Sequence, residues 1–69
     1  MKIAIIGNGG REHAIADQIS KSPKVNKLYC LPGNAGTKLI AENIKIDIYD
    51  FEKLGNFVDE YKINLVIVG

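Results

Sequence analysis

The chain has 69 residues, of which 46% are hydrophobic, and its nine basic and eight acidic residues leave a formal net charge of +1. This length is near the lower limit for an independent domain, so we expect one domain or part of one. The balanced charge excludes a basic nucleic-acid-binding surface, and no apolar run approaches the roughly 20 residues of a membrane span. With one cysteine, no internal disulfide and no signal-peptide pattern, we expect a cytoplasmic protein without nucleic-acid or membrane partners.

The first half of the chain predicts a strand, a helix, a second strand and a short helical turn, over residues 2–6, 11–21, 27–31 and 37–41. The first strand is a β-branched run that ends at a glycine, which is typical of a buried parallel strand. The helix has Ile15 and Ile19 one turn apart on its apolar face, and Pro23 stops it.

The second half predicts a strand over residues 44–48, a helix over 51–61 and a last strand over 65–68. Isoleucines alternate with polar residues in the first of these, which predicts an edge strand with one buried face. Asp50 is a good N-cap for the helix. The helix carries one apolar face that we expect in the core, made of Phe51, Leu54, Phe57, Val58 and Tyr61.

This order of elements predicts an α/β fold, with a Rossmann-like parallel sheet in the strand order 3-2-1-4. Ligands of such sheets bind beyond the carboxyl ends of the strands, where Gly7 and Gly69 are expected. The last strand is apolar on both faces, yet nothing after Gly69 supplies a neighbour. We therefore expect a sheet that is incomplete at its C-terminal edge, either in a fragment or in a module that pairs with something else; self-association through the exposed fourth strand is one such pairing.

The segment from Gly7 to Arg11 predicts an anion site. Gly7, Gly9 and Gly10 let a ligand approach the backbone, and the amides at the start of the following helix favour an anion. Arg11 adds a permanently charged fork that suits phosphate. The alternative is that the glycines serve only a tight turn between strand and helix.

The same segment fits other phosphate-binding fingerprints poorly. In the dinucleotide pattern G-x-G-x-x-G the third glycine is replaced by Glu12, and the second strand ends in Leu31-Pro32 without the acidic residue that binds a ribose. The lysine-containing P-loop is absent as well. A stand-alone Rossmann-like nucleotide-binding module remains the alternative function.

Two motifs at this spacing resemble the N-terminal loops of the phosphoribosylamine–glycine ligases, also called glycinamide ribonucleotide synthetases. They are Gly-Asn-Gly-Gly-Arg-Glu-His-Ala over residues 7–14 and Pro-Gly-Asn-Ala-Gly-Thr over residues 32–37. The resemblance covers residues 1–69 and implies an N-terminal pre-ATP-grasp domain without the ATP-grasp domains. It implies an enzyme of de novo purine biosynthesis, in which ATP activates glycine and 5-phosphoribosylamine attacks the resulting acyl phosphate.

The resemblance also implies where the ligands bind. ATP and Mg²⁺ would bind mainly outside this chain, on the remaining ATP-grasp domains, so no catalytic or metal-binding residue is assigned here and the chain alone is expected to be inactive. The candidate residues for 5-phosphoribosylamine are Gly9, Gly10, Arg11, Asn34, Gly36 and Thr37. Outside this set, Glu12 is expected to interact with the helix dipole, His13 to make a structural hydrogen bond, and Cys30 to be buried.

Overall fold

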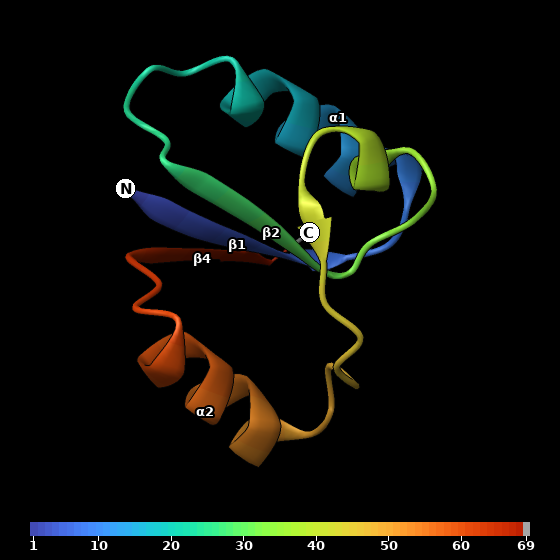
Figure 1. Ribbon diagram of the computed structural model, residues 1–69. Helices are drawn as coiled ribbons and strands as arrows, with labels where there is room; N and C mark the ends of the chain where they lie inside the picture. Colours follow the sequence, from blue (N-terminus) through green and yellow to red (C-terminus); the bar gives the residue numbers. More distant parts are fainter. Residues whose placement is uncertain (69) are drawn as a thin grey trace.

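Residues 1–68 are described by a computed structural model, in which a four-stranded parallel sheet lies between two helices (Figure 1). The elements in chain order are β1 (Lys2–Gly7), α1 (Gly10–Ser20), β2 (Lys27–Pro32), the 3₁₀ turn η1 (Thr37–Leu39), β3 (Glu42–Asn43), α2 (Phe51–Glu60) and β4 (Leu65–Val68). The strands are ordered β3-β2-β1-β4, and all neighbours are parallel. The predicted Rossmann-like fold and strand order are therefore confirmed.

The two faces of the sheet bury alternate residues of the same strands. Ile5 and Cys30 are fully buried on the face that α1 covers, where they pack with Ala16. On the opposite face Ala4 and Leu31 pack beneath α2. Figure 1 shows the two helices on opposite sides of the sheet, as right-handed crossovers in opposite directions from the first strand require.

An aromatic cluster fixes α2 on the sheet. The ring of Phe57 lies edge-on to Tyr29, with centroids 5.3 Å apart, and the Tyr61 ring packs on both. Phe57 is buried as predicted, whereas Phe51 is 76% exposed, so its assignment to the core was wrong. Phe51 lies in the first turn of α2, ahead of the part of the helix that contacts the sheet.

The predicted third strand over residues 44–48 is wrong, because β3 comprises only Glu42 and Asn43. The ladder with β2 ends where the amide of Ile44 donates to the carbonyl of Cys30. Ile46 then donates back to Ile44 at 2.9 Å, a local turn that takes the chain off the sheet towards α2. The alternating burial of residues 44–49 was correctly predicted, but it belongs to an irregular segment that packs on α2.

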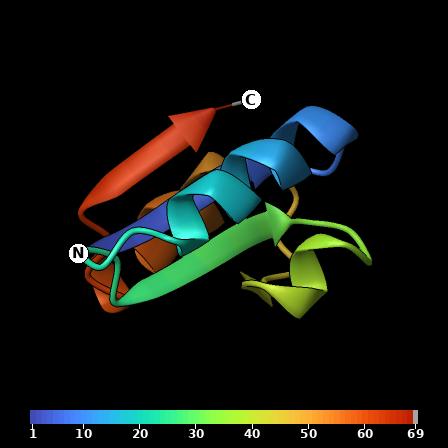
Figure 2. The same ribbon diagram turned by 90° about the horizontal axis from the view of Figure 1, so that it is seen from above.

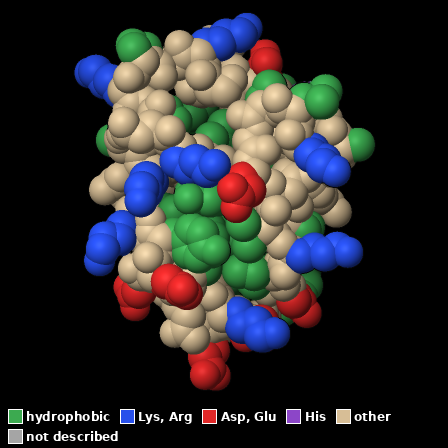
Figure 3. Space-filling view, viewed as in Figure 1, with side chains coloured by type: hydrophobic (Ala, Val, Ile, Leu, Met, Phe, Trp, Pro, Cys, Tyr) green, Lys and Arg blue, Asp and Glu red, His purple; other side chains and the backbone are tan. Residues whose placement is uncertain are grey.

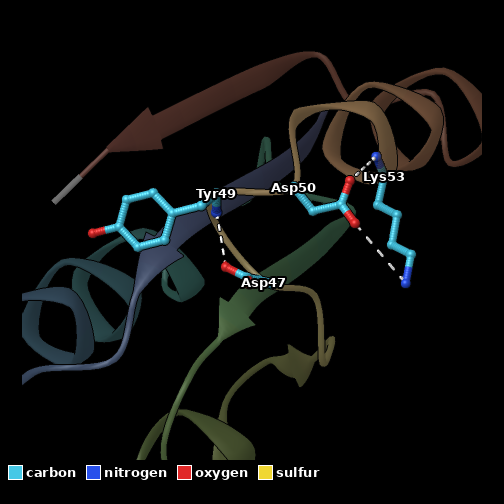
Figure 4. A network of polar contacts seen from close by, with 4 residues as sticks. All are labelled: Asp47, Tyr49, Asp50 and Lys53. Atoms are coloured by element: carbon cyan, nitrogen blue, oxygen red, sulfur yellow. Dashed lines mark hydrogen bonds and ion pairs between the residues drawn. The ribbon is translucent and has the colours of Figure 1, made fainter.

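The connection into α2 is held by local polar contacts (Figure 4). Asp47 accepts a hydrogen bond from the amide of Tyr49, and Asp50 accepts one from the amide of Lys53 at 3.1 Å. Asp50 is thus the predicted N-cap, and it satisfies one of the free amides at the start of α2.

At the other side of the sheet, β4 pairs with β1 and leaves its outer edge open within the described residues (Figure 2). Three of its side chains are 39–73% exposed, namely Leu65, Val66 and Val68. The expected position of Gly69 beside Gly7 lies outside the described residues.

Candidate functional site

The two motif loops meet at the carboxyl ends of β1 and β2. Gly7 and Pro32 are register partners at the last position of the two strands, and the amide of Gly33 donates to the carbonyl of Gly7 at 3.1 Å. Beyond this point the side-chain amide of Asn34 donates to the carbonyl of Asn8 at 2.8 Å and lies 3.4 Å from that of Gly9. Segments 25 residues apart in sequence therefore form one surface.

The first loop, residues 7–11, is shaped around the Glu12 side chain. Gly7 has φ +145°, and a Cβ at Gly7 would collide with the Glu12 side chain. The Glu12 carboxylate also accepts a hydrogen bond from the Gly9 amide at 3.1 Å and so caps α1. The expected interaction of Glu12 with the helix dipole takes this form, and it occupies one amide that we had expected to serve a ligand.

The next amides along the helix stay available. Those of Gly10 and Arg11 have no hydrogen-bond partner within residues 1–68, because the first turn of a helix has no intrahelical acceptor for them. The side chain of Arg11 is exposed, and no carboxylate of the described residues pairs with it. A cation in a first turn is mildly unfavourable, so an anionic ligand there would be stabilised by both groups.

The second loop, residues 32–37, is held by its own side chains. Gly33 has φ +74°, and a Cβ there would collide with the side chains of Asn43 and Thr37. The Thr37 hydroxyl accepts from the amide of Asn34 at 2.8 Å, and Asn34 in turn accepts from the amide of Thr37 at 2.9 Å. Thr37 is fully buried, so its hydroxyl is committed to the loop.

The side chains of His13 and Cys30 lie next to the second loop. The ring of His13 lies directly against Gly36, where a Cβ would collide with it; this packing contact replaces the expected hydrogen bond. Cys30 is buried as predicted, and burial raises the pKa of its thiol, while a hydrogen bond with Thr37 acts in the opposite direction. The thiol is therefore neutral near pH 7 and has the role of a small core residue.

A groove of about 760 Å³ runs along the edge formed by β2 and β3, next to the second loop. Gly33 and Asn43 line its end, and Lys27, Lys38 and Lys45 line its sides. Lys27 pairs with Glu42 at 3.2 Å, whereas the other two lysines have no such partner within residues 1–68. Figure 3 shows an exposed hydrophobic area in this view, with both basic and acidic side chains around it.

The six candidate residues thus fall into one exposed group and one inner group. Gly10 and Arg11 are exposed, and Gly9 meets Asn34 between the two loops. Gly36 and Thr37 lie behind Asn34, where they contact His13 and Asn43. Asn43 was not predicted from the sequence, because the alternating isoleucines that follow it predict a strand further along the chain.

Within residues 1–68, no three carboxylate, imidazole or thiol groups lie close enough together to hold a metal ion. No helix of this part is long and apolar enough to cross a membrane either. The groups that the first loop leaves exposed, the Gly10 and Arg11 amides and the Arg11 guanidinium, are hydrogen-bond donors of the kind that suits an anion.

The fold and site define a class: a Rossmann-like α/β domain with two interlocked loops at the carboxyl ends of its central strands. The family model described as phosphoribosylglycinamide synthetase, N domain, matches residues 1–69. The chain belongs to this family.

Its relatives include proteins named phosphoribosylamine–glycine ligase. The one from Caldanaerobacter subterraneus subsp. tengcongensis is 48% identical over 69 residues, covering all of this chain and 16% of the relative. The one from Pasteurella multocida is 51% identical over 71 aligned residues, covering all of this chain and 17% of the relative. The chain thus spans about one sixth of the length of these relatives.

Proposed function

We propose that this chain is the substrate-side N-terminal domain of a phosphoribosylamine–glycine ligase, an ATP-dependent C–N ligase of purine biosynthesis in the cytoplasm. Its role is to hold 5-phosphoribosylamine while the remaining ATP-grasp domains bind ATP, Mg²⁺ and glycine. The proposal is supported by the family membership and by the names of the relatives.

The observation that carries the proposal is the junction of the two loops. The Asn34 side chain ties the second loop to the carbonyls of Asn8 and Gly9, beside the free amides of Gly10 and Arg11. A sugar phosphate has an anionic end for the amides and the guanidinium, and hydroxyl groups for amide and carbonyl groups. We therefore assign the phosphate to Gly10 and Arg11. Gly9 and Asn34 lie beside the sugar in this proposal, and Gly36 and Thr37 hold the second loop behind Asn34.

The alternative, a dinucleotide-binding module, is disfavoured by Glu12. Its carboxylate lies against Gly7 and Gly9, in the part of the loop that a diphosphate approaches in dinucleotide-binding proteins. The negative charge of this carboxylate would repel the negative charge of a diphosphate. The loop accordingly suits a single phosphate further along the helix.

The test is a titration of the chain with ribose 5-phosphate, a stable analogue of 5-phosphoribosylamine, followed by amide NMR. We expect shifts confined to residues 9–11 and 34–37. Arg11→Ala should weaken binding about tenfold, the loss of one charge-assisted contact. Lys24→Ala is the matched control, because it removes an exposed cation without an ion pair among the described residues.

Two outcomes would contradict the proposal. Selective binding of NADH would favour the nucleotide-binding module. Absence of any amide shift at millimolar ribose 5-phosphate would show that the assigned residues do not bind this ligand.

A further inference from the structure

Asn43 lies outside the two motifs, yet its side chain hydrogen-bonds to two residues of the second loop. It belongs to β3, which is only two residues long, and it follows the second loop by six residues. A strand this short contributes little pairing energy. Its effect on the molecule is to bring one side-chain amide beside the loop.

The contacts of Asn43 form a closed network. Its Oδ1 accepts from the Thr37 hydroxyl at 2.8 Å, and its Nδ2 donates to the carbonyl of Asn34 at 2.8 Å. The Asn34 amide donates to the same Thr37 hydroxyl at 2.8 Å. Each member is thus both donor and acceptor, and the hydrogen bonds of such a partly buried ring strengthen one another.

The proton count fixes the direction of the network. The Thr37 hydroxyl has one proton and two acceptors within reach, Asn43 Oδ1 at 2.8 Å and the Asn34 carbonyl at 3.0 Å. The Asn34 carbonyl already accepts from both Asn43 Nδ2 and the Lys38 amide, and Asn43 Oδ1 has no proton of its own, so the hydroxyl proton goes to Asn43 Oδ1. A flipped Asn43 would set two oxygens against each other at the Asn34 carbonyl.

The network also explains the glycine at position 33. The Asn43 amide and the Thr37 hydroxyl fill the space that a Cβ at Gly33 would need. The loop is therefore held on the β3 side, while its other side reaches the first loop through Asn34 Nδ2. Movement of Asn43 would be transmitted to the first loop through Asn34, and also through Gly33, whose amide donates to the carbonyl of Gly7.

We infer that Asn43 is a positioning residue for the sugar-phosphate site: it holds Asn34 in the place from which Asn34 fixes the glycine loop. The inference rests on the proposed function for the identity of the ligand. Asn43 does not touch the ligand in this account; it acts through Thr37 and Asn34.

The inference is tested with the variant Asn43→Ala, and Asn64→Ala is the matched control. Asn64 accepts a hydrogen bond from the amide of Lys2 at 2.7 Å, beside the amino end of β1, so its loss removes an amide-to-backbone contact away from the loops. Amide NMR of the ligand-free chain should show shifted or broadened signals for residues 8–11 and 34 in Asn43→Ala only. The affinity for ribose 5-phosphate should fall about tenfold in Asn43→Ala and be unchanged in Asn64→Ala, both measured on fully folded protein.

Thr37→Val and Thr37→Ser provide a second route if Asn43→Ala does not fold. Valine removes the hydroxyl that donates to Asn43, and serine keeps it. Only Thr37→Val should therefore shift or broaden the amide signals of the first loop. Equal spectra of the first loop in Asn43→Ala and Asn64→Ala, or equal effects of valine and serine, would overturn the inference. Absence of binding by the unmodified chain would overturn the proposed function instead, and the ligand-free spectra would still decide whether Asn43 positions the glycine loop.

Discussion

The two loops at the carboxyl ends of β1 and β2 have similar compositions but are stabilised in different ways. The first, residues 7–11, leaves amides and a guanidinium free and is closed by one carboxylate from α1. The second, residues 32–37, commits its polar groups to an internal network with Asn43. A glycine-rich sequence therefore does not by itself define a binding loop: one loop presents free polar groups, and the other uses its polar groups internally and contacts the first through Asn34.

The largest difference should come from adding a methyl group to a glycine in each loop. Gly33→Ala forces an alanine to φ +74° and into the side chains of Asn43 and Thr37. It should lower the free energy of unfolding by about 2–4 kcal/mol. Gly10→Ala, at a position with no atom within 4 Å of the added Cβ, should change it by no more than about 0.5 kcal/mol.

Urea denaturation of the two alanine variants measures both values. Similar losses at the two positions would show that the loops do not differ in packing as described.

The next effect concerns the buried hydroxyl of the second loop. Thr37→Val leaves the Asn34 amide and Asn43 Oδ1 without their partner and should cost about 2 kcal/mol. Thr37→Ser retains the hydroxyl and should cost about 1 kcal/mol, through the lost methyl group. Thermal melting of both variants checks the order, and a serine variant that is less stable than the valine variant would contradict the network.

In the first loop, Glu12→Ala removes the cap of α1 and should cost about 1 kcal/mol. Glu12→Gln keeps an oxygen for the Gly9 amide and should cost less than half of that. Urea denaturation compares them. An alanine variant as stable as the unmodified chain would show that the carboxylate does not hold the loop closed.

The smallest expected effect is a pH dependence of stability that comes from Cys30, next to the second loop. The pKa of the Cys30 thiol is raised by burial above its ordinary value of 9.0, so the unfolded chain loses this proton at lower pH than the folded chain. The contribution of the thiol to stability is therefore complete below pH 9 and falls as the pH rises above that value. Cys30→Ala is the control: the loss of stability between pH 8 and about 10 should be smaller in this variant than in the unmodified chain. An equal loss in both would contradict the raised pKa.

Much of the fold was predictable because most strands and helices have a clear local sequence pattern. The short β-branched runs at residues 2–6 and 65–68 gave the correct strands, and Asp50 gave the correct start of α2. The error at residues 44–48 has a physical cause: burial alternates whenever a segment lies extended over a core, whether or not its backbone pairs. Phe51 follows the helical period, but the period does not tell where the helix leaves the sheet.

The candidate site was predictable only in part, for a related reason. The glycines and Arg11 are adjacent in sequence and follow a strand, so their grouping at a helix start could be foreseen. The role of Asn43 depends on η1, which lies within the short helical turn predicted over residues 37–41, and on a two-residue strand that has no strong local pattern. Likewise, the contact of His13 with Gly36 arises only when α1 packs beside the second loop.

The most direct test of the account is a crystal structure of the chain with ribose 5-phosphate bound. The account predicts the phosphate within hydrogen-bonding distance of the Gly10 and Arg11 amides and of the Arg11 guanidinium, with the ribose next to Asn34. A ribosyl group lodged elsewhere, for example in the lysine-lined groove beside β3, would contradict it.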